Sequence, residues 1–463
     1  MKVVKIGGGC LNGKNVIKDI VELIQKRCCG DVIVVSALKG ITDYLIENIS
    51  LALEHEENIP QIINRIKSKH INTARHLIDE PESMKQFSKD LNKTLTQLER
   101  LFYGLNFTKE ITPRTYDTIS CYGERFSAQM LTAVLRSRGV HALCLMPHTI
   151  GMLTDGKFGD ATANLKQTAL NFQQSVAPLI SPQTILFVPG FYGVSETGDI
   201  TTFGRGGSDY SAAVVAAALN AEVLEIWKDV DGFMSADPGY VPDAELIPVL
   251  SYEEAAELAY FGAKILHPRS IEPIRAKKLD IRITNTLNPD AQGSIVTRTS
   301  PITRNIIKSV AYDEQIGILK VYASGVGARP GILAIVANQL SQSGINIRSV
   351  VTSQTCISFL LDRKDLNPGR AALRTITPRP YRRIETTDDV SLIGIVGDGV
   401  HRKKGIAARC FAAVAACDVN VEMISYGPSR SALYFITRKS DLLRALNAIH
   451  STFFSTPRCL PDN

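Results

Sequence analysis

One short stretch of the chain brings together residue types that could handle phosphate and carboxylate groups. Residues 201–210 read Thr-Thr-Phe-Gly-Arg-Gly-Gly-Ser-Asp-Tyr, and small residues with helical spacing follow over 211–218. Glycines let the backbone approach phosphate oxygens, and a helix N-terminus offers free N–H groups and positive potential to an anion. Arg205 could hold a carboxylate or phosphate in a fork, and Asp209 could orient a metal or a donor group. The stretch predicts phosphoryl chemistry on a small anionic molecule.

A second glycine-rich turn lies near the start of the chain. Lys5 stands at the end of an apolar run, and residues 7–9 are three glycines. Lys5 would neutralise charge on a transferred phosphoryl group, while Gly7 and Gly8 would offer backbone N–H groups. A Walker A loop over residues 8–14 is the alternative, but Asn15 stands where a Ser or Thr must bind magnesium. We therefore interpret Lys5 and its glycines as a different kind of phosphate site.

The elements that must position these residues form a β-α-β pattern. Residues 2–6 and 32–37 are short apolar runs typical of buried parallel strands, and residues 16–26 between them have helical spacing. Open α/β sheets bind ligands at the carboxyl ends of such strands. Residues 44–107 have helical spacing with many charges and predict a helical insertion that frames the substrate site. Further strands are expected at 185–188, 222–226 and 280–284.

The C-terminal third contains an internal repeat. Residues 331–340, Gly-Ile-Leu-Ala-Ile-Val-Ala-Asn-Gln-Leu, align without gaps on residues 405–414 at an offset of 74 (405 − 331 = 74). Each copy is typical of a strand, a glycine turn, an amphipathic helix and another strand. Two copies are too few for a solenoid, so they should pair side by side. Residues 366–383, with five arginines and three prolines, are expected to be a solvated linker between them.

Composition describes a globular protein of two or three domains. The chain has 463 residues, 44% hydrophobic and 21% charged, without an apolar run long enough for a membrane span or a signal peptide. A cytoplasmic location, with no membrane partner, is therefore expected. The net charge of +6 is scattered, which favours anionic substrates over nucleic acid. The nine cysteines lack zinc-like spacing and predict reduced thiols; Cys10 has no neighbouring base that would make it catalytic.

Five blocks, taken in order, resemble the aspartate kinase family of the amino-acid kinase superfamily. They are Lys5-Ile-Gly-Gly, residues 34–43, Ser120-Cys-Tyr-Gly-Glu-Arg-Phe-Ser, residues 202–212 and residues 258–268. The resemblance implies an α/β fold: a three-layer amino-acid kinase sandwich with a mostly parallel central sheet over 1–300. Two C-terminal α+β ACT domains of ferredoxin-like topology would follow over 304–388 and 389–463.

The resemblance also implies an activity and a set of site residues. ATP and L-aspartate would give ADP and 4-phospho-L-aspartate, with Mg²⁺ carried by ATP and no direct protein ligand to the metal. Lys5 and Asp209 are the implied catalytic residues. The implied aspartate site consists of Thr42, Glu124, Arg205 and Ser208. The implied nucleotide site consists of Lys5, Gly7, Gly8, Ser36, Lys228, Asp229 and Lys264.

The chain departs from the family pattern at the rim of this site. Gly9-Cys10 stands where the family usually has Thr-Ser, Lys228 where it has Thr, Met234 where it has Tyr, and Gly239 where it has Arg. These departures bear on nucleotide affinity and on the choice of substrate. A kinase for another small acidic metabolite and a catalytically weak, effector-binding subunit remain the alternatives.

The first repeat carries a turn that suits an amino-acid effector. Residues 325–331 open its helix and would present free N–H groups to a carboxylate. The expected effector site consists of Val326, Arg329, Gly331, Ile332, Asn346 and Ser353, with lysine or threonine as ligand. The paired repeats would also make a homodimer or a higher oligomer; a dimerisation module without a ligand is the alternative. Because the chemistry-bearing residues precede 300, deleting 304–463 should change regulation more than chemistry.

Overall fold

The chain divides into two compact units. The structure, a computed structural model, describes residues 1–262, 265–299, 306–328 and 330–454. The first unit comprises Met1–Phe233, Pro248–Ala256 and Lys264–Ser300, and the second comprises Met234–Ile247, Glu257–Ala263 and Pro301–Asn463. The catalytic domain expected over 1–300 is therefore interrupted. The physical reason is that Ala236 and Val241 are buried in the same apolar core as Ile393 and Leu433.

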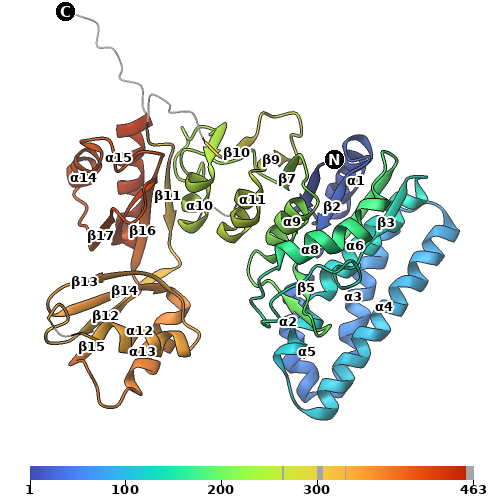
Figure 1. Ribbon diagram of the computed structural model, residues 1–463, viewed down its shortest axis with the longest axis horizontal. Helices are drawn as coiled ribbons and strands as arrows, with labels where there is room; N and C mark the ends of the chain where they lie inside the picture. Colours follow the sequence, from blue (N-terminus) through green and yellow to red (C-terminus); the bar gives the residue numbers. More distant parts are fainter. Residues whose placement is uncertain (263–264, 300–305, 329, 455–463) are drawn as a thin grey trace, which may run out of the picture. The chain divides into compact units, whose positions relative to one another are not determined.

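An eight-stranded sheet forms the centre of the first unit (Figure 1). The strand order is β3-β4-β2-β1-β7-β9-β10-β8, and every neighbouring pair is parallel except β9 and β10. The strands are β1 (Val3–Ile6), β2 (Val32–Val35), β3 (His141–Cys144), β4 (Thr184–Pro189), β7 (Val223–Lys228), β8 (Val249–Ser251), β9 (Asp280–Asn285) and β10 (Ser294–Thr297). The mostly parallel α/β fold predicted from the sequence is confirmed.

Helices cover both faces of this sheet. Successive side chains of β1 point to opposite faces, so each face carries a different set of β1 residues. Val4 and Ile6 pack in a large apolar core with α1 (Lys14–Arg27) and Trp227. Lys5 points to the opposite face and meets α9 (Gly207–Ala218). Nearly every residue of α9 is small and buried, which allows close packing on the sheet. The neighbours of α9 include α8 (Leu165–Ser175) and α11 (Ile271–Lys277).

The segment expected as a helical insertion is helical. Residues 44–107 belong to α2 (Ile41–Glu54), α3 (Ile59–Ala74) and α4 (Pro81–Thr108), which pack against one another (Figure 1). The buried residues of α4 recur at helical spacing: Phe87, Leu91, Leu95, Leu98, Phe102 and Leu105. Two more helices follow, α5 (Pro113–Ser120) and α6 (Tyr122–Ser137). The chain also forms α7 (Pro147–Ile150) and a hairpin of β5 (Tyr192–Val194) and β6 (Ile200–Thr202), and the residues of α10 (Tyr252–Tyr260) divide between the two units.

The second unit contains two four-stranded antiparallel sheets that follow the internal repeat. One has the order β13-β14-β12-β15 and the other β11-β16-β18-β17. Ile332 and Ile406, the first residues of α12 and α14, keep the offset of the repeat (406 − 332 = 74). The strands are β11 (Ser309–Asp313), β12 (Ile316–Tyr322), β13 (Ile347–Thr352), β14 (Cys356–Asp362), β15 (Arg383–Thr387), β16 (Val390–Val396), β17 (Met423–Tyr426) and β18 (Ala432–Arg438). The helices are α12 (Ile332–Gln342), α13 (Leu366–Arg374), α14 (Ile406–Ala416) and α15 (Leu442–Phe454).

Two expectations about this unit are wrong. β11 falls within the range expected for the first ACT domain, but it pairs with β16 and so completes the sheet of the second. The arginine-rich segment expected as a linker instead forms α13, whose Leu366 and Leu373 are buried in the first repeat's core. β15 then returns to pair with β12. In the part of the chain that the structure describes, no helix is long and apolar enough to cross a membrane.

Candidate active site

The strand end that carries Lys5 meets the first turn of α9, which carries Asp209. Lys5 Nζ lies 2.5 Å from Asp209 Oδ1, and the two side chains are only 5% and 10% exposed. Burial alone would raise the pKa of Asp209, but Lys5 and Lys228 outweigh it and hold the pKa below its usual value. Asp209 is therefore ionised at neutral pH. The two predicted catalytic residues form one buried ion pair.

The glycine turn after β1 is tight and closely approached. The Cys10 and Leu11 N–H groups donate to the Gly7 and Gly8 carbonyls, each at 3.1 Å. A Cβ on Gly7 would lie 3.3 Å from Lys5 Nζ, and a Cβ on Gly8 would lie 3.3 Å from the Ala37 carbonyl oxygen. Because Gly7 and Gly8 have no side chains, the backbone of the turn lies open beside the Lys5 ammonium. A phosphate can therefore contact the backbone N–H groups and the ammonium together.

The ends of β2 and β7, the two strands that flank β1, complete the predicted nucleotide side. Ser36 follows β2, and its N–H donates to the Ile6 carbonyl. Lys228 ends β7, and Asp229 follows with a carboxylate oxygen 3.4 Å from where a Cβ on Gly9 would stand. Burial and the Lys5 charge lower the pKa of Lys228, although Asp209 and Asp229 act in the opposite direction. The structure thus brings Ser36, Lys228 and Asp229 to the glycine turn.

Glu124 lies in the first turn of α6, close enough to Lys5 for the lysine charge to act on its carboxyl. Glu124 is only 4% exposed, and its Oε2 atom has no hydrogen-bond partner among the described residues. Burial raises the pKa of this carboxyl to about 8, while the Glu124 and Ala37 N–H groups and the Lys5 charge partly oppose the shift. A Cβ on Gly123 would lie 3.2 Å from Thr42 Oγ1, so Thr42 is adjacent. A buried carboxyl oxygen that has no partner among the described residues suits a substrate ammonium group.

Arg205 and Ser208 stand at the start of α9. Gly206, the N-cap of this helix, has a φ of 74°, and a Cβ there would lie 2.3 Å from the His267 ring. Only glycine fits such a position. Ser208 lies against Gly190, just beyond β4. Arg205 is exposed and forms no ion pair within the described parts of the chain, which leaves its guanidinium available to a carboxylate.

Comparison with known proteins agrees with this geometry. The model of the amino acid kinase family matches residues 1–285, and a model of the ACT domain matches residues 393–453. Chloroplastic aspartokinase 1 of Arabidopsis thaliana is 30% identical over 98% of this chain and 80% of its own length. The chain belongs to the aspartokinase family. The resemblance identified from five sequence blocks is confirmed.

Other aspartokinases extend the comparison. A bifunctional aspartokinase/homoserine dehydrogenase of Haemophilus influenzae is 29% identical, and the match covers 99% of this chain but 57% of that protein. The crystal structure of E. coli aspartokinase III with aspartate and ADP, in the R-state, has a TM-score of 0.82 and 24% identity. That match covers 98% of this chain and 100% of the other. The same aspartokinase has been solved with lysine and aspartate in the T-state.

Several residues that support the site were missed by sequence reasoning. Arg269 donates to the Phe203 carbonyl at 3.0 Å and to Asp160 at 2.6 Å, and its guanidinium lies 4.7 Å over the Tyr210 ring. Asp117 is fully buried and accepts hydrogen bonds from the N–H groups of Gly159 and Thr202. Both residues fix the loop before α9. Asp117 gave no sequence signal, whereas Arg269 directly follows a block that resembles the family.

His267 also belongs to this support. Its ring packs on Gly206, and burial lowers its pKa although the Asp209 charge acts in the opposite direction. It lies inside the block at 258–268 that resembles the family, which was the available signal. Lys264, predicted from the same block, lies outside the described residues, as does Arg329 of the expected effector site.

The expected effector residues separate into two groups. The Val326 N–H donates to the Gln354 carbonyl, which places the turn at 325–331 beside Ser353. Gly331 is the N-cap of α12, with a φ of 99°, and Ile332 is the buried first residue of that helix. Asn346 precedes β13 whereas Ser353 follows it, so these two lie at opposite ends of one strand. A single copy of the repeat does not bring Asn346 to the turn.

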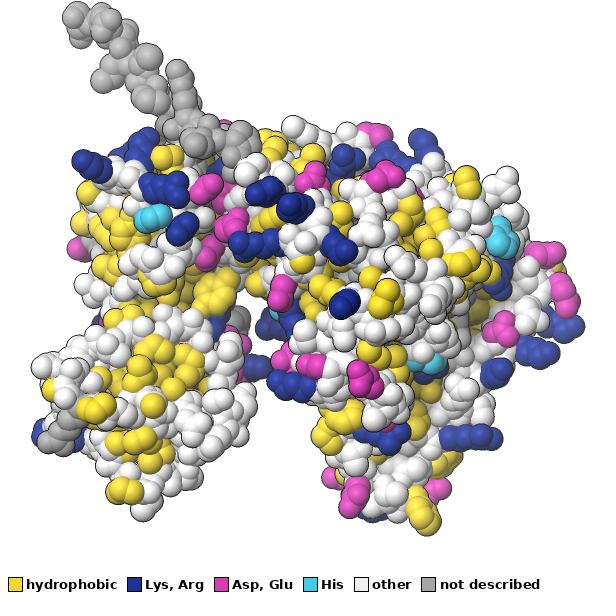
Figure 2. All heavy atoms as spheres, viewed as in Figure 1, with side chains coloured by type: hydrophobic (Ala, Val, Ile, Leu, Met, Phe, Trp, Pro, Cys, Tyr) yellow, Lys and Arg dark blue, Asp and Glu magenta, His cyan; other side chains and the backbone are white. Residues whose placement is uncertain are grey.

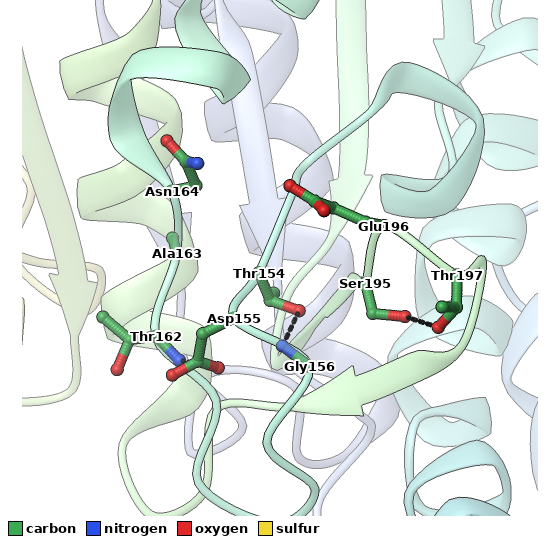
Figure 3. Close-up of a pocket in the computed structure, with 9 residues that line it drawn as sticks. All are labelled: Thr154, Asp155, Gly156, Thr162, Ala163, Asn164, Ser195, Glu196 and Thr197. Carbon is green, nitrogen blue, oxygen red and sulfur yellow. Dashed lines mark hydrogen bonds between the residues drawn. The ribbon is translucent and has the colours of Figure 1, made fainter.

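A separate pocket of about 470 Å³ opens beside the β5–β6 hairpin (Figure 3). Residues 154–156, 162–164 and 195–197 line it, and they include none of the predicted site residues. In Figure 3, Ser195 and Thr197 are joined by a hydrogen bond of 2.8 Å, and Thr154 accepts one from the Gly156 N–H at 3.4 Å. These polar groups are already paired with one another. On the face drawn in Figure 2, basic and acidic side chains are interspersed.

Proposed function

We propose that the protein transfers the γ-phosphoryl group of ATP to the β-carboxylate of L-aspartate. A carboxylate oxygen attacks the γ-phosphorus in line, and the bond from phosphorus to the β–γ bridging oxygen breaks. Its electron pair stays on ADP, and the products are ADP and 4-phospho-L-aspartate. The carboxylate is already ionised at neutral pH, so positioning and charge neutralisation can carry catalysis without a general base.

The observation that carries the proposal is the buried Lys5–Asp209 pair together with the Oε2 atom of Glu124, which is buried and has no partner among the described residues. Lys5 neutralises the phosphoryl oxygens, and Asp209 holds the ammonium of Lys5 in place at 2.5 Å. Glu124 accepts from the substrate ammonium, because its Oε2 has no other partner among the described residues. Arg205 holds a substrate carboxylate in a fork and Thr42 donates to one. Ser208 completes this side of the site.

The nucleotide side is built from backbone and cations. Gly7 and Gly8 offer N–H groups to the phosphates, and Ser36, Lys228 and Asp229 surround the same turn; Lys264 is proposed for the same side from the sequence alone. Mg²⁺ bound to ATP would neutralise charge on the β- and γ-phosphates. Asp209 is paired with Lys5, so phosphate and water oxygens would supply the ligands of this ion, and no protein side chain would bind it directly.

Regulation and assembly are part of the same proposal. Lysine or threonine would bind the first ACT domain through the turn at 325–331 and Ser353, with Asn346 supplied from a second copy in a homodimer. The separation of Asn346 from that turn supports two copies. The enzyme would serve the first step toward the aspartate-derived amino acids in the cytoplasm. Calorimetry of the full chain with lysine, threonine and methionine, alongside its mass in solution, tests this part.

A substrate panel tests the activity. ADP release would be followed with L-aspartate, D-aspartate, L-glutamate and succinate at equal ATP. L-aspartate should give the highest kcat/KM. Succinate keeps both carboxylates but lacks the ammonium, so it should be roughly 10⁴-fold poorer, because Glu124 is then left buried without a partner. Faster turnover of another acid would assign the protein to that substrate, and no acid-dependent ADP release would reject the kinase proposal.

A further inference from the structure

One short loop carries residues that we assign to both substrates. It begins at Ser36, directly after β2, and ends at Thr42, in the first turn of α2. Ser36 is assigned to the nucleotide and Thr42 to aspartate. Because so few residues separate the two, a displacement of this loop would move both of them at once. Whatever holds the loop in place therefore affects both halves of the site.

Two consecutive N–H groups of this loop are held by one face of α6. The Ala37 N–H donates to the Glu124 carboxylate, and the Leu38 N–H donates to Ser127 Oγ at 2.9 Å. Glu124 and Ser127 are three residues apart on α6, so their side chains lie on the same face of the helix. Ser127 is fully buried, and removing its hydroxyl would leave the Leu38 N–H without a partner in a place shielded from water.

The helix α9 holds a second strand-end loop in the same way. Ser211 lies three residues after Ser208 and is also fully buried. Its Oγ accepts from the Phe191 N–H at 2.8 Å, in the loop that follows β4. In both helices, a residue assigned to aspartate is followed about one turn later by a buried serine that accepts from the backbone of a loop. The two hydroxyls therefore each fix a loop that borders the proposed aspartate site.

The helical insertion holds the loop at 36–42 from the solvent side. Lys69, which is exposed on α3, donates to the Lys39 carbonyl. The Lys39 N–H in turn donates to the Leu11 carbonyl, in the glycine turn, at 3.2 Å. The loop is thus attached to α6, to α3 and to the turn after β1. The contact with Ser127 lies between Ser36 and Thr42 and is buried, so its loss should disturb both residues most.

We propose that Ser127 is a positioning residue for both substrates: its hydroxyl holds the loop at 36–42 against α6 and so sets the places of Ser36 and Thr42. This inference rests on the proposed kinase function. Ser127 contacts neither substrate and exchanges no proton. Its effect is geometric, because a displacement of about 1 Å in a binding or reacting group can cost roughly 10²-fold in rate.

S127A and T168V form a matched pair of variants. S127A removes the acceptor of the Leu38 N–H. T168V removes the same kind of bond away from the site, because Thr168 Oγ1, fully buried on α8, accepts from the Leu153 N–H at 3.0 Å. S127A should lower kcat/KM for aspartate by roughly 10²-fold and should also raise the KM for ATP. T168V should lower the melting temperature to a similar extent but leave both constants almost unchanged.

A surface variant tests the same loop without disturbing the core. K69M removes the contact between α3 and the Lys39 carbonyl, and K67M removes another lysine of the same helix. K69M should change the two constants in the same direction as S127A but by a smaller factor, and K67M should behave as wild type. An S127A variant that does not fold, together with a K69M variant that behaves like K67M, would overturn the proposal.

The pH dependence of aspartate binding is a readout that lost stability alone would not move. Burial raises the pKa of Glu124 to about 8, and the Ala37 N–H and the Lys5 charge oppose this rise. Release of the loop in S127A should weaken the Ala37 contact, so the pKa should rise further. The dissociation constant for aspartate should therefore level off at a higher pH in S127A than in the wild type or T168V.

Hydrogen exchange and ADP binding separate this inference from the kinase proposal, because neither needs turnover. A peptide covering residues 36–42 should exchange faster in S127A than in the wild type or T168V, and calorimetry should show weaker ADP binding in S127A alone. A folded S127A with unchanged exchange in this peptide, or with wild-type affinities for ADP and aspartate, would overturn the role of Ser127 even if the wild type is an active aspartate kinase. A wild type inactive on aspartate, with faster exchange and weaker ADP binding in S127A, would reject the substrate and keep Ser127.

Discussion

Two buried carboxylates of the site have opposite pKa shifts, and their neighbours explain the difference. Asp209 has Lys5 at 2.5 Å and Lys228 nearby, so its pKa is lowered in spite of burial. Glu124 has no such cation in contact among the described residues, and burial raises its pKa to about 8. Asp209 is therefore a permanent anion that orders the lysines. Glu124 becomes an anion in response to a cationic ligand.

Removing either member of the Lys5–Asp209 pair should abolish most turnover without unfolding the protein. K5A and D209A should each lower kcat by roughly 10²–10³-fold, since one preorganised charge contact is worth about 2.7–4 kcal/mol in the barrier. Steady-state ADP release measures the effect, and K14Q, which neutralises the exposed lysine at the start of α1, is the control for the loss of one positive charge in K5A. Near-normal turnover in a folded variant would remove that residue from the catalytic set.

The raised pKa of Glu124 predicts a pH-dependent affinity for aspartate. Below pH 8 the free carboxyl is mostly protonated, and the substrate ammonium must displace that proton. The dissociation constant should therefore fall, by up to tenfold per pH unit, as pH rises from 6 to 8, and then level off. Binding should also release a proton, which calorimetry in buffers of different ionisation enthalpy measures.

E124Q is the control for this effect. The amide cannot ionise, so its affinity for aspartate should be weaker than wild type at pH 8.5 and flat across the range. If the pH dependence persists in E124Q, another group is responsible and Glu124 does not bind the ammonium.

At the scale of elements, patterning indicated the strands and helices but not all of their partners. The apolar runs of β1 and β2 and the small residues of α9 were readable because both faces of a parallel sheet are buried. The pairing of β11 with β16 could not be predicted, because the alternation of apolar and polar residues identifies a strand but not the strand beside it. The helix α13 was not predicted, because its arginines lie on one side of an amphipathic helix and were interpreted as part of a solvated linker.

The same limit applies to the site. Lys5 and Asp209 are far apart in the sequence, and the resemblance together with the strand-end rule was needed to pair them. Arg269 and Asp117 act through contacts with backbone groups of distant loops, which a single sequence does not reveal. Glu124 was identified, but its raised pKa follows from burial that only the folded chain has.

The start of α9 depends on a glycine that no other residue can replace. G206A would force a Cβ to 2.3 Å from the His267 ring at a φ of 74°. Gly198, in the β5–β6 turn, also has a positive φ of 84°, but a Cβ there would meet nothing within 4 Å. G206A should therefore cost about 3 kcal/mol of unfolding free energy and much of the activity, whereas G198A should cost about 1 kcal/mol. Urea unfolding measures both; equal costs would contradict the crowding.

At the scale of the whole molecule, the boundary between chemistry and regulation does not follow the chain. Segments 234–247 and 257–262 lie before residue 300 but belong to the second unit. The Phe261 ring packs closely on Gly394: a Cβ on Gly394 would lie 2.6 Å from this ring. The centroid of the Phe261 ring is 5.4 Å from the centroid of the Tyr434 ring. Arg348 donates to the Tyr260 carbonyl at 2.5 Å and lies 4.8 Å over its ring.

This interleaving changes the expected outcome of a truncation. Removing 304–463 would expose Phe261, Val241 and Ala236, all of which are buried in the full chain. The fragment should therefore be insoluble or inactive, rather than an unregulated kinase as the sequence alone suggested. Solubility, size-exclusion chromatography and ADP release of the fragment would measure this. A folded, active fragment would restore the simpler division at residue 300.

We propose that the phosphoryl group reaches the β-carboxylate of L-aspartate at the turn that follows Lys5. Trapping with hydroxylamine tests it most directly, because an acyl phosphate is converted to a stable hydroxamate. The wild type with ATP, Mg²⁺ and L-aspartate should form aspartate β-hydroxamate in a one-to-one ratio with ADP, and K5A should form almost none. ADP without hydroxamate would exclude transfer to the β-carboxylate, and hydroxamate formed equally well by K5A would exclude a catalytic role for Lys5.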